Sequence, residues 1–362
     1  MVTQALARRW GAALPLVLVL AACSAGTSAT PSATQSLAPP ASGGPSASAS
    51  AAAGDLASVC QEASDKEGQL VYWNNLANPD PIFKAFNEAY PNIKIESLTL
   101  RPDDNAQRVL TEAAAGKQIT PDLIYAGLDV LQPVISRKLI KSDIDWQALG
   151  VAEDLTAEAS DMVRLYRTAG GLVYNPQVTK PEDLPNTWDE IIDPKWEGKV
   201  IVDPRGRPFD QLSLEWGEQQ TLDWVTRFVK TDKPIVVEGG TAGMVAVAGG
   251  QGAFTTGGRD AETLEQQAKG TPLAIKFLDL IPTLDTYNAV IATARHPLSA
   301  ECFAGWIATD GAAVHQKAEF KTNETIPPSA PQGAKVIVVD SPEKAAAVSD
   351  IGKKIGAIET GT

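Results

Sequence analysis

Segments with strand and helix patterns alternate in the first part of the chain, and this alternation constrains the fold more than any other feature. Short apolar stretches typical of buried strands are separated by segments whose apolar residues recur at helical spacing. The expected elements are a strand over 69–73, a helix over 79–90, a strand over 93–100, a helix over 103–116 and a strand over 122–128. This order predicts an α/β fold with parallel strands joined by right-handed crossovers.

In an open sheet of this kind, ligands gather beyond the carboxyl ends of the strands. Asn74 and Asn75 follow the first expected strand, and Gly127 and Asp129 lie at the end of the third. We therefore take these four residues as candidate ligand-binding residues. The two asparagines have an equally good explanation as turn residues that cap the next helix.

A second region, from about 170 to 279, repeats the alternation. Strands are expected over 171–174, 199–202, 234–237 and 251–255, with a helix over 219–229. The glycine-rich stretch 239–250 lacks the Gly-Lys-Ser/Thr ending of a phosphate loop and is not GxGxxG, so we expect an ordinary helix with glycine ends. A strand over 288–292 and a helix over 297–310 follow.

The N-terminus carries the pattern of a secretory signal over residues 1–22. Arg8 and Arg9 precede an apolar run over 12–20, which is too short to span a bilayer. The run ends in Leu20-Ala21-Ala22-Cys23, which resembles a bacterial lipobox and implies a lipidated (palmitate-type) Cys23. An ordinary signal peptide followed by a chance cysteine is the alternative.

Residues 24–54 are almost all Ala, Ser, Pro, Gly or Thr, and none of them is charged. Such a stretch buries too little apolar surface to order itself, so 23–54 is expected to be a disordered tether. The folded part would then hang from the cell membrane by lipid, facing the periplasm or the cell exterior.

Charge and residue counts exclude several classes of protein. The chain has 44 acidic and 31 basic residues, and a surface this negative disfavours nucleic-acid binding. Two histidines and three cysteines leave little for a zinc finger or a histidine-rich metal centre. No Gly-x-Ser-x-Gly or His-Glu-x-x-His motif occurs, so we do not expect an enzyme. A secreted, lipid-anchored hydrolase with paired carboxylates remains a second alternative.

Several segments resemble the ferric-iron and related extracellular solute-binding proteins of ABC importers. Together they cover most of residues 68–330. The most specific stretch runs from 173 to 204 and includes KPEDLP at 180–185 and DPKWEGK at 193–199. AFNEAYPNIKI at 85–95, the alanines and glycine of 113–116 with Pro121-Asp122-Leu123, and ATARHPLSAECFAGW at 292–306 add to the resemblance.

The resemblance implies a two-lobed type II periplasmic-binding-protein fold, each lobe a mainly parallel sheet flanked by helices, with a ligand cleft between the lobes. One lobe would combine 55–168 with 280–320, and the other would be 169–279, with 321–362 as an optional addition. The protein would act as a monomer without a cofactor, and would deliver a small solute to a permease in the cytoplasmic membrane.

The ligand is expected to differ from bare iron. Ferric binders of this family present adjacent tyrosines after a second-lobe strand, and their phenolate oxygens suit a hard cation. Here that strand runs into Thr255, Thr256 and Arg259. Of the tyrosines near the expected cleft, Tyr287 is retained as a candidate, although it has an ordinary packing explanation.

Arg205 and Arg207 follow the expected strand 199–202, at a position that faces the cleft in the resembled fold. Arginine can hold a carboxylate or phosphonate through two hydrogen bonds, although a solvated turn would also explain both residues. The main hypothesis is therefore a small polar, anionic solute of phosphonate or carboxylate type. The alternative is a binder of ferric iron or an iron chelate.

If Cys23 carries lipid, Cys60 and Cys302 remain as a pair in an oxidising compartment. Both belong to the first lobe in the division above, and we expect a disulfide between them. Two buried thiols that never meet are the alternative.

Overall fold

The computed structural model describes residues 53–157, 162–324 and 326–362, which belong to one compact unit. The predicted signal peptide, Cys23 and the tether up to residue 52 lie outside the described residues. Residues 53 and 54, assigned above to the tether, already belong to helix α1 (Ala53–Lys66).

The first lobe is built around three parallel strands. β1 (Gln69–Asn74) pairs with β2 (Lys94–Thr99) on one side and with β3 (Leu123–Ala126) on the other. The helices between them are α2 (Asp80–Ala89) and α3 (Pro102–Ala114), and α4 (Leu128–Ile135) follows β3. The predicted strand–helix alternation is confirmed, but the third strand ends at Ala126, because Gly127 caps the start of α4.

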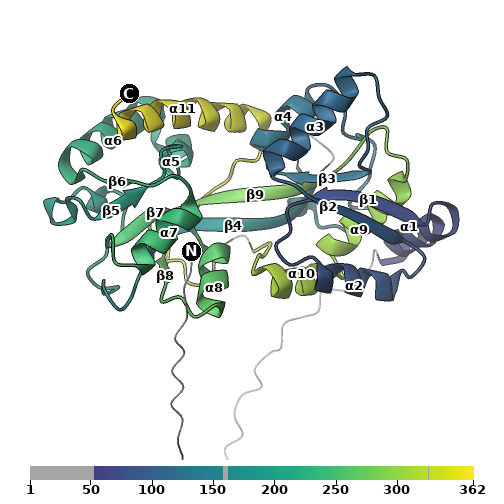
Figure 1. Ribbon diagram of the computed structural model, residues 1–362, viewed down its shortest axis with the longest axis horizontal. Coiled ribbons are helices and arrows are strands. Elements are labelled where there is room, and N and C mark those ends of the chain that lie inside the picture. Colours follow the sequence, from purple (N-terminus) through teal and green to yellow (C-terminus); the bar gives the residue numbers. More distant parts are fainter. Residues whose placement is uncertain (1–52, 158–161, 325) are drawn as a thin grey trace, which may run out of the picture. The chain divides into compact units, whose positions relative to one another are not determined.

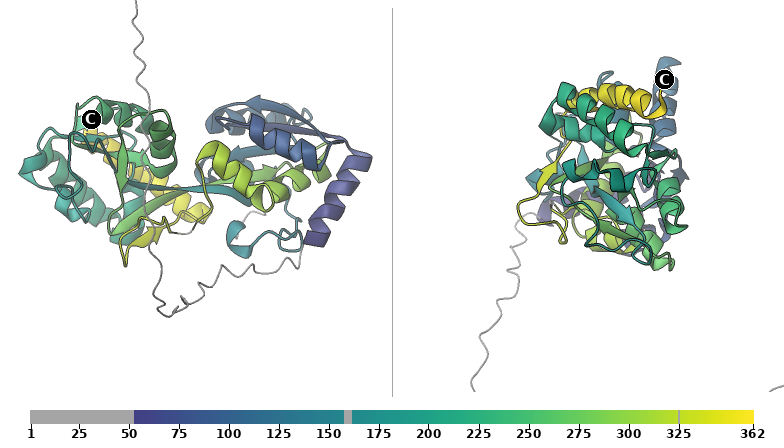
Figure 2. Two further views of the ribbon diagram at one scale, coloured as in Figure 1. Left: turned by 90° about the horizontal axis from the view of Figure 1, so that it is seen from below. Right: turned by 90° about the vertical axis from the view of Figure 1, so that its left-hand side faces the viewer.

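Two long strands connect the lobes. β4 (Val163–Tyr174) and β9 (Leu280–Val290) pair in antiparallel fashion, and both run from one lobe into the other (Figures 1 and 2). The predictions of short strands over 171–174 and 288–292 were wrong in extent. Polar side chains such as Arg164, Arg167 and Asp285 interrupt the apolar pattern of these strands, yet the structure buries them.

The second lobe continues the same sheet. The strand order is β2-β1-β3-β9-β4-β7-β5-β6, with β10 on β9 and β8 on β4. Its strands are β5 (Val200–Val202), β6 (Ile235–Val236), β7 (Phe254–Arg259) and β8 (Ala274–Lys276). Its helices are α5 (Phe209–Trp216), α6 (Glu218–Asp232), α7 (Gly240–Ala248) and α8 (Asp260–Ala268). The glycine-rich stretch is thus the helix that was expected, and short 3₁₀ turns lie at Glu153–Leu155, Asp189–Ile191 and Pro194–Trp196.

β7 lies further along the chain than the predicted strand over 251–255, so Thr256 and Arg259 are inside the strand rather than after it. Gly257 and Gly258 hid this extension, because glycine is uncommon in strands. Gly258 is required by the packing: a Cβ there would lie 2.4 Å from Cγ2 of Val173 on β4.

The remaining chain adds α9 (Pro297–Ala308), α10 (Ala312–Glu319), β10 (Lys335–Ile337) and α11 (Pro342–Thr360). α9 and α10 belong with the first lobe, whereas α11 lies along α5 and α6 and reaches α4 (Figure 1). The helix predicted over 297–310 is confirmed to within two residues. Among the described helices, none is both long and apolar enough to cross a membrane.

Each lobe has its own aromatic core. Phe303 of α9 packs on Tyr72 and Phe86 in the first lobe, and Phe209 packs on Trp188 and Trp224 in the second. Both cores include residues of β4, such as Leu165 in the first lobe and Leu172 in the second, so this strand belongs to both lobes.

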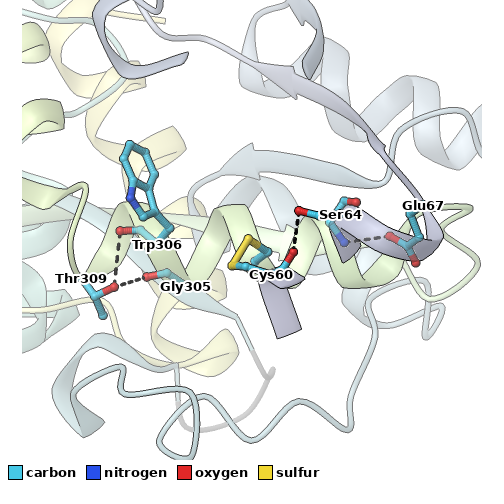
Figure 3. Close-up of a disulfide and its surroundings, with 8 residues drawn as sticks. Cys60, Ser64, Glu67, Gly305, Trp306 and Thr309 are labelled. Atoms are coloured by element: carbon cyan, nitrogen blue, oxygen red, sulfur yellow. Dashed lines mark hydrogen bonds between the residues drawn. A yellow bond between two sulfur atoms is a disulfide. The ribbon is translucent and has the colours of Figure 1, made fainter. Parts of the chain in front are cut away.

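Cys60 and Cys302 form a disulfide, as predicted. Their Cα atoms are 4.9 Å apart across 242 residues of sequence, and both residues are fully buried. The bond joins α1 to α9, and Figure 3 shows the hydrogen bonds around it, including the one that Ser64 Oγ donates to the carbonyl of Cys60. Because α1 follows the predicted tether, this bond fixes the first described helix to the core.

Candidate functional site

Two adjoining cavities lie beside the crossover strands. The large compartment has a volume of about 380 Å³ and lies between the start of α4, the segment after β5, and α11. The small compartment, about 210 Å³, lies between the end of β7 and the start of α7. Both are lined by Arg205, Arg207 and Leu284, so we describe them together as the cleft.

The small compartment contains polar groups without partners. Thr256 is 1% exposed, and its Oγ1 accepts and donates no hydrogen bond. Nη1 of Arg259 is also buried without a hydrogen-bond partner. Burial lowers the pKa of Arg259, and the positive charge of Arg207 lowers it further. Gly240 and Thr241, in the first turn of α7, line the same space.

Carboxylates are present near Arg259 but do not pair with it. Glu262, Asp210 and Asp260 act electrostatically to raise its pKa, yet none of the described carboxylates forms an ion pair with it. Glu262 lines the small compartment and has an Oε2 without a hydrogen-bond partner. A buried guanidinium nitrogen without a partner is costly, so Nη1 of Arg259 favours an anionic ligand, whereas Oε2 of Glu262 opposes one in the same compartment.

Arg205, in contrast, is already paired inside the chain. Its Nε donates to Oδ1 of the buried Asp203 over 2.9 Å, and its Nη2 forms an ion pair with the same carboxylate. Burial opposes the ionisation of Asp203, but the hydrogen bonds and the charge of Arg205 outweigh it and lower the pKa of Asp203. Arg205 therefore stabilises its own loop before any ligand arrives.

Arg207 connects the two lobes. Its Nη2 lies 3.5 Å from Oδ2 of Asp129, in the first turn of α4, and both side chains are 33% exposed. Gly127 makes room for this carboxylate, because a Cβ at Gly127 would lie 2.7 Å from Oδ1 of Asp129. The structure thus brings together Asp129, Arg205, Arg207, Thr256 and Arg259 from the predicted set.

The other predicted residues line neither compartment. Asn74 is fully buried, its Oδ1 accepts from the backbone of Leu76, and its Nδ2 donates to Ser97, which is the turn role given above as its alternative. Asn75 is exposed beside it. The hydroxyl of Thr255 accepts from the backbone N–H of Gly257 over 3.3 Å.

Tyr287 lies in a different groove, where it lines a wall together with Arg164, Arg167 and Asp285. Its hydroxyl donates to Oδ2 of Asp285 over 3.4 Å. Burial, followed by the charge of Asp285, raises its pKa well above the ordinary value, so this phenol holds its proton.

Sequence reasoning missed several residues of the large compartment. Asp210 and Gln211 lie in the first turn of α5, and Ala345, Ser349 and Gly352 lie on α11. Burial raises the pKa of Asp210 to about 7. Neither α5 nor α11 was predicted from the sequence. The one sequence signal near α5 was the acidic residue Asp210, three positions after the Arg205-Gly206-Arg207 segment.

The described residues of the cleft provide no set of ligands for direct binding of a metal ion. No group of three or more His, Cys, Asp or Glu residues in the described part of the chain is placed to hold a metal ion. All six tyrosines are described, and none lines either compartment. The protein side chains of the cleft do not by themselves form a site for a hard cation.

The fold and cleft define a class of protein: a two-lobed α/β binding protein of the type II periplasmic kind. A sequence model of the family described as bacterial extracellular solute-binding protein matches residues 82–347, which is most of the chain. The protein therefore belongs to this family.

The chain is also similar to several proteins of known sequence or structure. The chain is 28% identical over 197 residues to "Iron uptake protein A1" of Synechocystis, a match that covers 51% of this chain and 52% of the relative, so it spans about half of that protein's length. Iron-bound HitA from Pseudomonas aeruginosa superposes with a TM-score of 0.63 at 19% identity, covering 80% of this chain and 99% of its own. AfuA from Actinobacillus pleuropneumoniae, with fructose-6-phosphate bound, gives 0.61 at 18%, covering 80% and 97%. These two structures confirm the predicted fold.

Proposed function

We propose that this protein is the solute-binding component of an ABC importer, and that it captures iron as a complex with a small organic anion. The observation that carries the proposal is the small compartment, where Nη1 of Arg259 and Oγ1 of Thr256 are buried without partners. A carboxylate of the organic anion would accept hydrogen bonds from both, and the first turn of α7 favours negative charge there.

Iron enters the proposal through the relative named as an iron uptake protein. That similarity favours the iron alternative over the phosphonate or carboxylate hypothesis. Because the described side chains of the cleft include no set of metal ligands, we infer that the organic anion supplies the oxygens around the metal. The protein would then recognise the complex mainly through its anionic groups.

A metal-free organic anion is the second candidate, and Arg259 is again the observation that favours it. It differs from the first in one property: the affinity for the anion would not depend on iron. A hydrolase receives no support from a family of solute-binding proteins.

The experiment is a titration of the protein, starting at residue 53 where α1 begins, with ferric citrate, citrate alone and inorganic phosphate. We expect ferric citrate to bind and Arg259→Gln to weaken that binding at least tenfold. Arg227→Gln, at an exposed arginine of α6, is the matched control and should bind as the wild type does. Equal affinity for citrate with and without iron would select the metal-free alternative. If Arg259→Gln binds ferric citrate normally, the proposed site is wrong.

The cellular setting is also proposed. Residues 1–22 would be removed, Cys23 would carry lipid, and a monomer would present its solute to a permease in the cytoplasmic membrane. We keep the division into a lobe of 55–168 with 280–320 and a lobe of 169–279. The packing of Ile351 and Ile355 in the second core supports adding 321–362 to the latter, whereas Ala345 packs in a separate apolar cluster with residues of β3 and α4.

A further inference from the structure

We propose that helix α11 forms the wall of the cleft that selects solutes by size, so that a bound solute extends from Arg259 into the large compartment and contacts Ser349. This inference rests on the proposed function, because it assumes that the anionic group of the solute sits in the small compartment. It concerns a helix that neither the sequence pattern nor the family resemblance assigned to the site.

The face of α11 that meets the large compartment is regular. Ala345, Val348, Ser349 and Gly352 line it, at the spacing that places residues on one face of a helix. Three of these four side chains are small, so the helix leaves room rather than filling it. Lys353 also lines the compartment, and its Nζ forms an ion pair with Oδ1 of Asp350 over 3.3 Å.

The wall is held in place from both lobes. Ala345 is buried in an apolar cluster with residues of β3 and α4, whereas Ile351 and Ile355 are buried in the core of the second lobe. In Figure 1, α11 extends from the second lobe toward α4, and contacts with α4, α5 and α6 agree.

Glycines let α11 approach the loop that carries the cleft arginines. A Cβ on Gly352 would lie 3.1 Å from the carbonyl oxygen of Arg205, and one on Gly356 would lie 2.1 Å from that of Pro204. On the loop side, a Cβ on Gly206 would lie 2.7 Å from the carbonyl oxygen of Gly352. The helix therefore contacts the Pro204–Arg205–Gly206 backbone directly, and its position and that of the arginines are coupled.

The volumes of the two compartments indicate which part of a solute α11 would contact. The small compartment, of about 210 Å³, contains the unpartnered groups that would take an anionic group. The adjoining 380 Å³ lies within the range of small-molecule sites and holds the arginine–aspartate pair between the lobes. A solute larger than its anionic group would extend into this adjoining space, and α11 forms one side of it.

The test places a bulky side chain on this face without disturbing the core. Ser349 is exposed to the compartment, so Ser349→Phe should fold and should weaken ferric citrate binding at least tenfold. Ala347→Phe, on the opposite exposed face of the same helix, is the matched control and should change the affinity less than twofold. If Ser349→Phe does not fold, Ser349→Leu provides the same test with a smaller group.

The possible results separate the two proposals. If Ser349→Phe binds ferric citrate like the wild type while Arg259→Gln does not bind, the role of α11 is refuted and the proposed function stands. If Ala347→Phe loses as much affinity as Ser349→Phe, size selection by the inner face is also refuted. If the wild type binds neither ferric citrate, citrate nor phosphate, the proposed function fails and this inference fails with it.

Discussion

Glu359 makes the stability of the protein depend on pH in a way that a single substitution can isolate. It lies near the end of α11, is 6% exposed, and neither of its carboxylate oxygens has a hydrogen-bond partner. Burial, followed by the nearby charges of Asp203 and Asp210, raises its pKa from 4.5 to about 8. Below this value the folded protein keeps Glu359 protonated.

Proton binding determines whether the unfolding free energy rises or falls with pH. Between pH 4.5 and about 8 the folded state holds a proton that the unfolded state has released, so the free energy of unfolding falls as the pH rises. At about 1.4 kcal/mol for each tenfold change in the ionisation constant, the upper bound for this residue is about 5 kcal/mol. Glu359→Gln removes this loss, because the amide cannot ionise.

The assay is urea unfolding at pH 5, 7 and 9, followed by tryptophan fluorescence. We subtract the unfolding free energy of the wild type from that of Glu359→Gln. This difference should be at least about 2 kcal/mol more positive at pH 9 than at pH 5. Glu343→Gln, at an exposed position of the same helix, is the control and should show no such increase. A difference for Glu359→Gln that does not vary with pH would refute the argument.

Three further predictions concern the fold and its attachment. Replacing Cys60 and Cys302 by serine removes the bond that closes a loop of more than 240 residues, and should lower the unfolding free energy by about 5 kcal/mol in urea titrations; an unchanged midpoint would contradict this. Gly356→Ala should cost about 1–3 kcal/mol, because its Cβ would meet the carbonyl oxygen of Pro204, whereas Gly249→Ala, at an exposed position with an ordinary φ of −79° and no close contact, controls for the loss of a glycine. Cys23→Ser should release the protein from the membrane fraction of the source cells, and retention of the variant would rule out lipid at this residue.

The sequence predicted the first lobe better than the second for a physical reason. Between β1 and β3 the apolar residues follow strand and helix periods closely, because each element buries one side and exposes the other. β4 and β9 carry Arg164, Arg167 and Asp285, which satisfy one another across the strands once they pair. A single strand read alone gives no sign of that compensation, so both were predicted too short.

The site residues, too, were predicted only where a recognisable element of the sequence led to them. Arg207 and Arg259 were found because they follow or end a recognisable strand. Asn74 was a misleading candidate, since the polar residue after a strand also serves to shape a turn. Asp210 and the inner face of α11 were missed because more than 130 residues separate them in sequence and only packing brings them together.

In the proposed function, the cleft holds iron through the organic anion that accompanies it. The most direct measurement is the crystal structure of the protein with ferric citrate, with the iron located by anomalous diffraction. We expect the iron in the cleft, a citrate carboxylate on Arg259 and Thr256, and no protein oxygen within bonding distance of the metal. Iron bound directly by protein side chains, or citrate located away from Arg259, would contradict the proposed binding of iron through its organic anion.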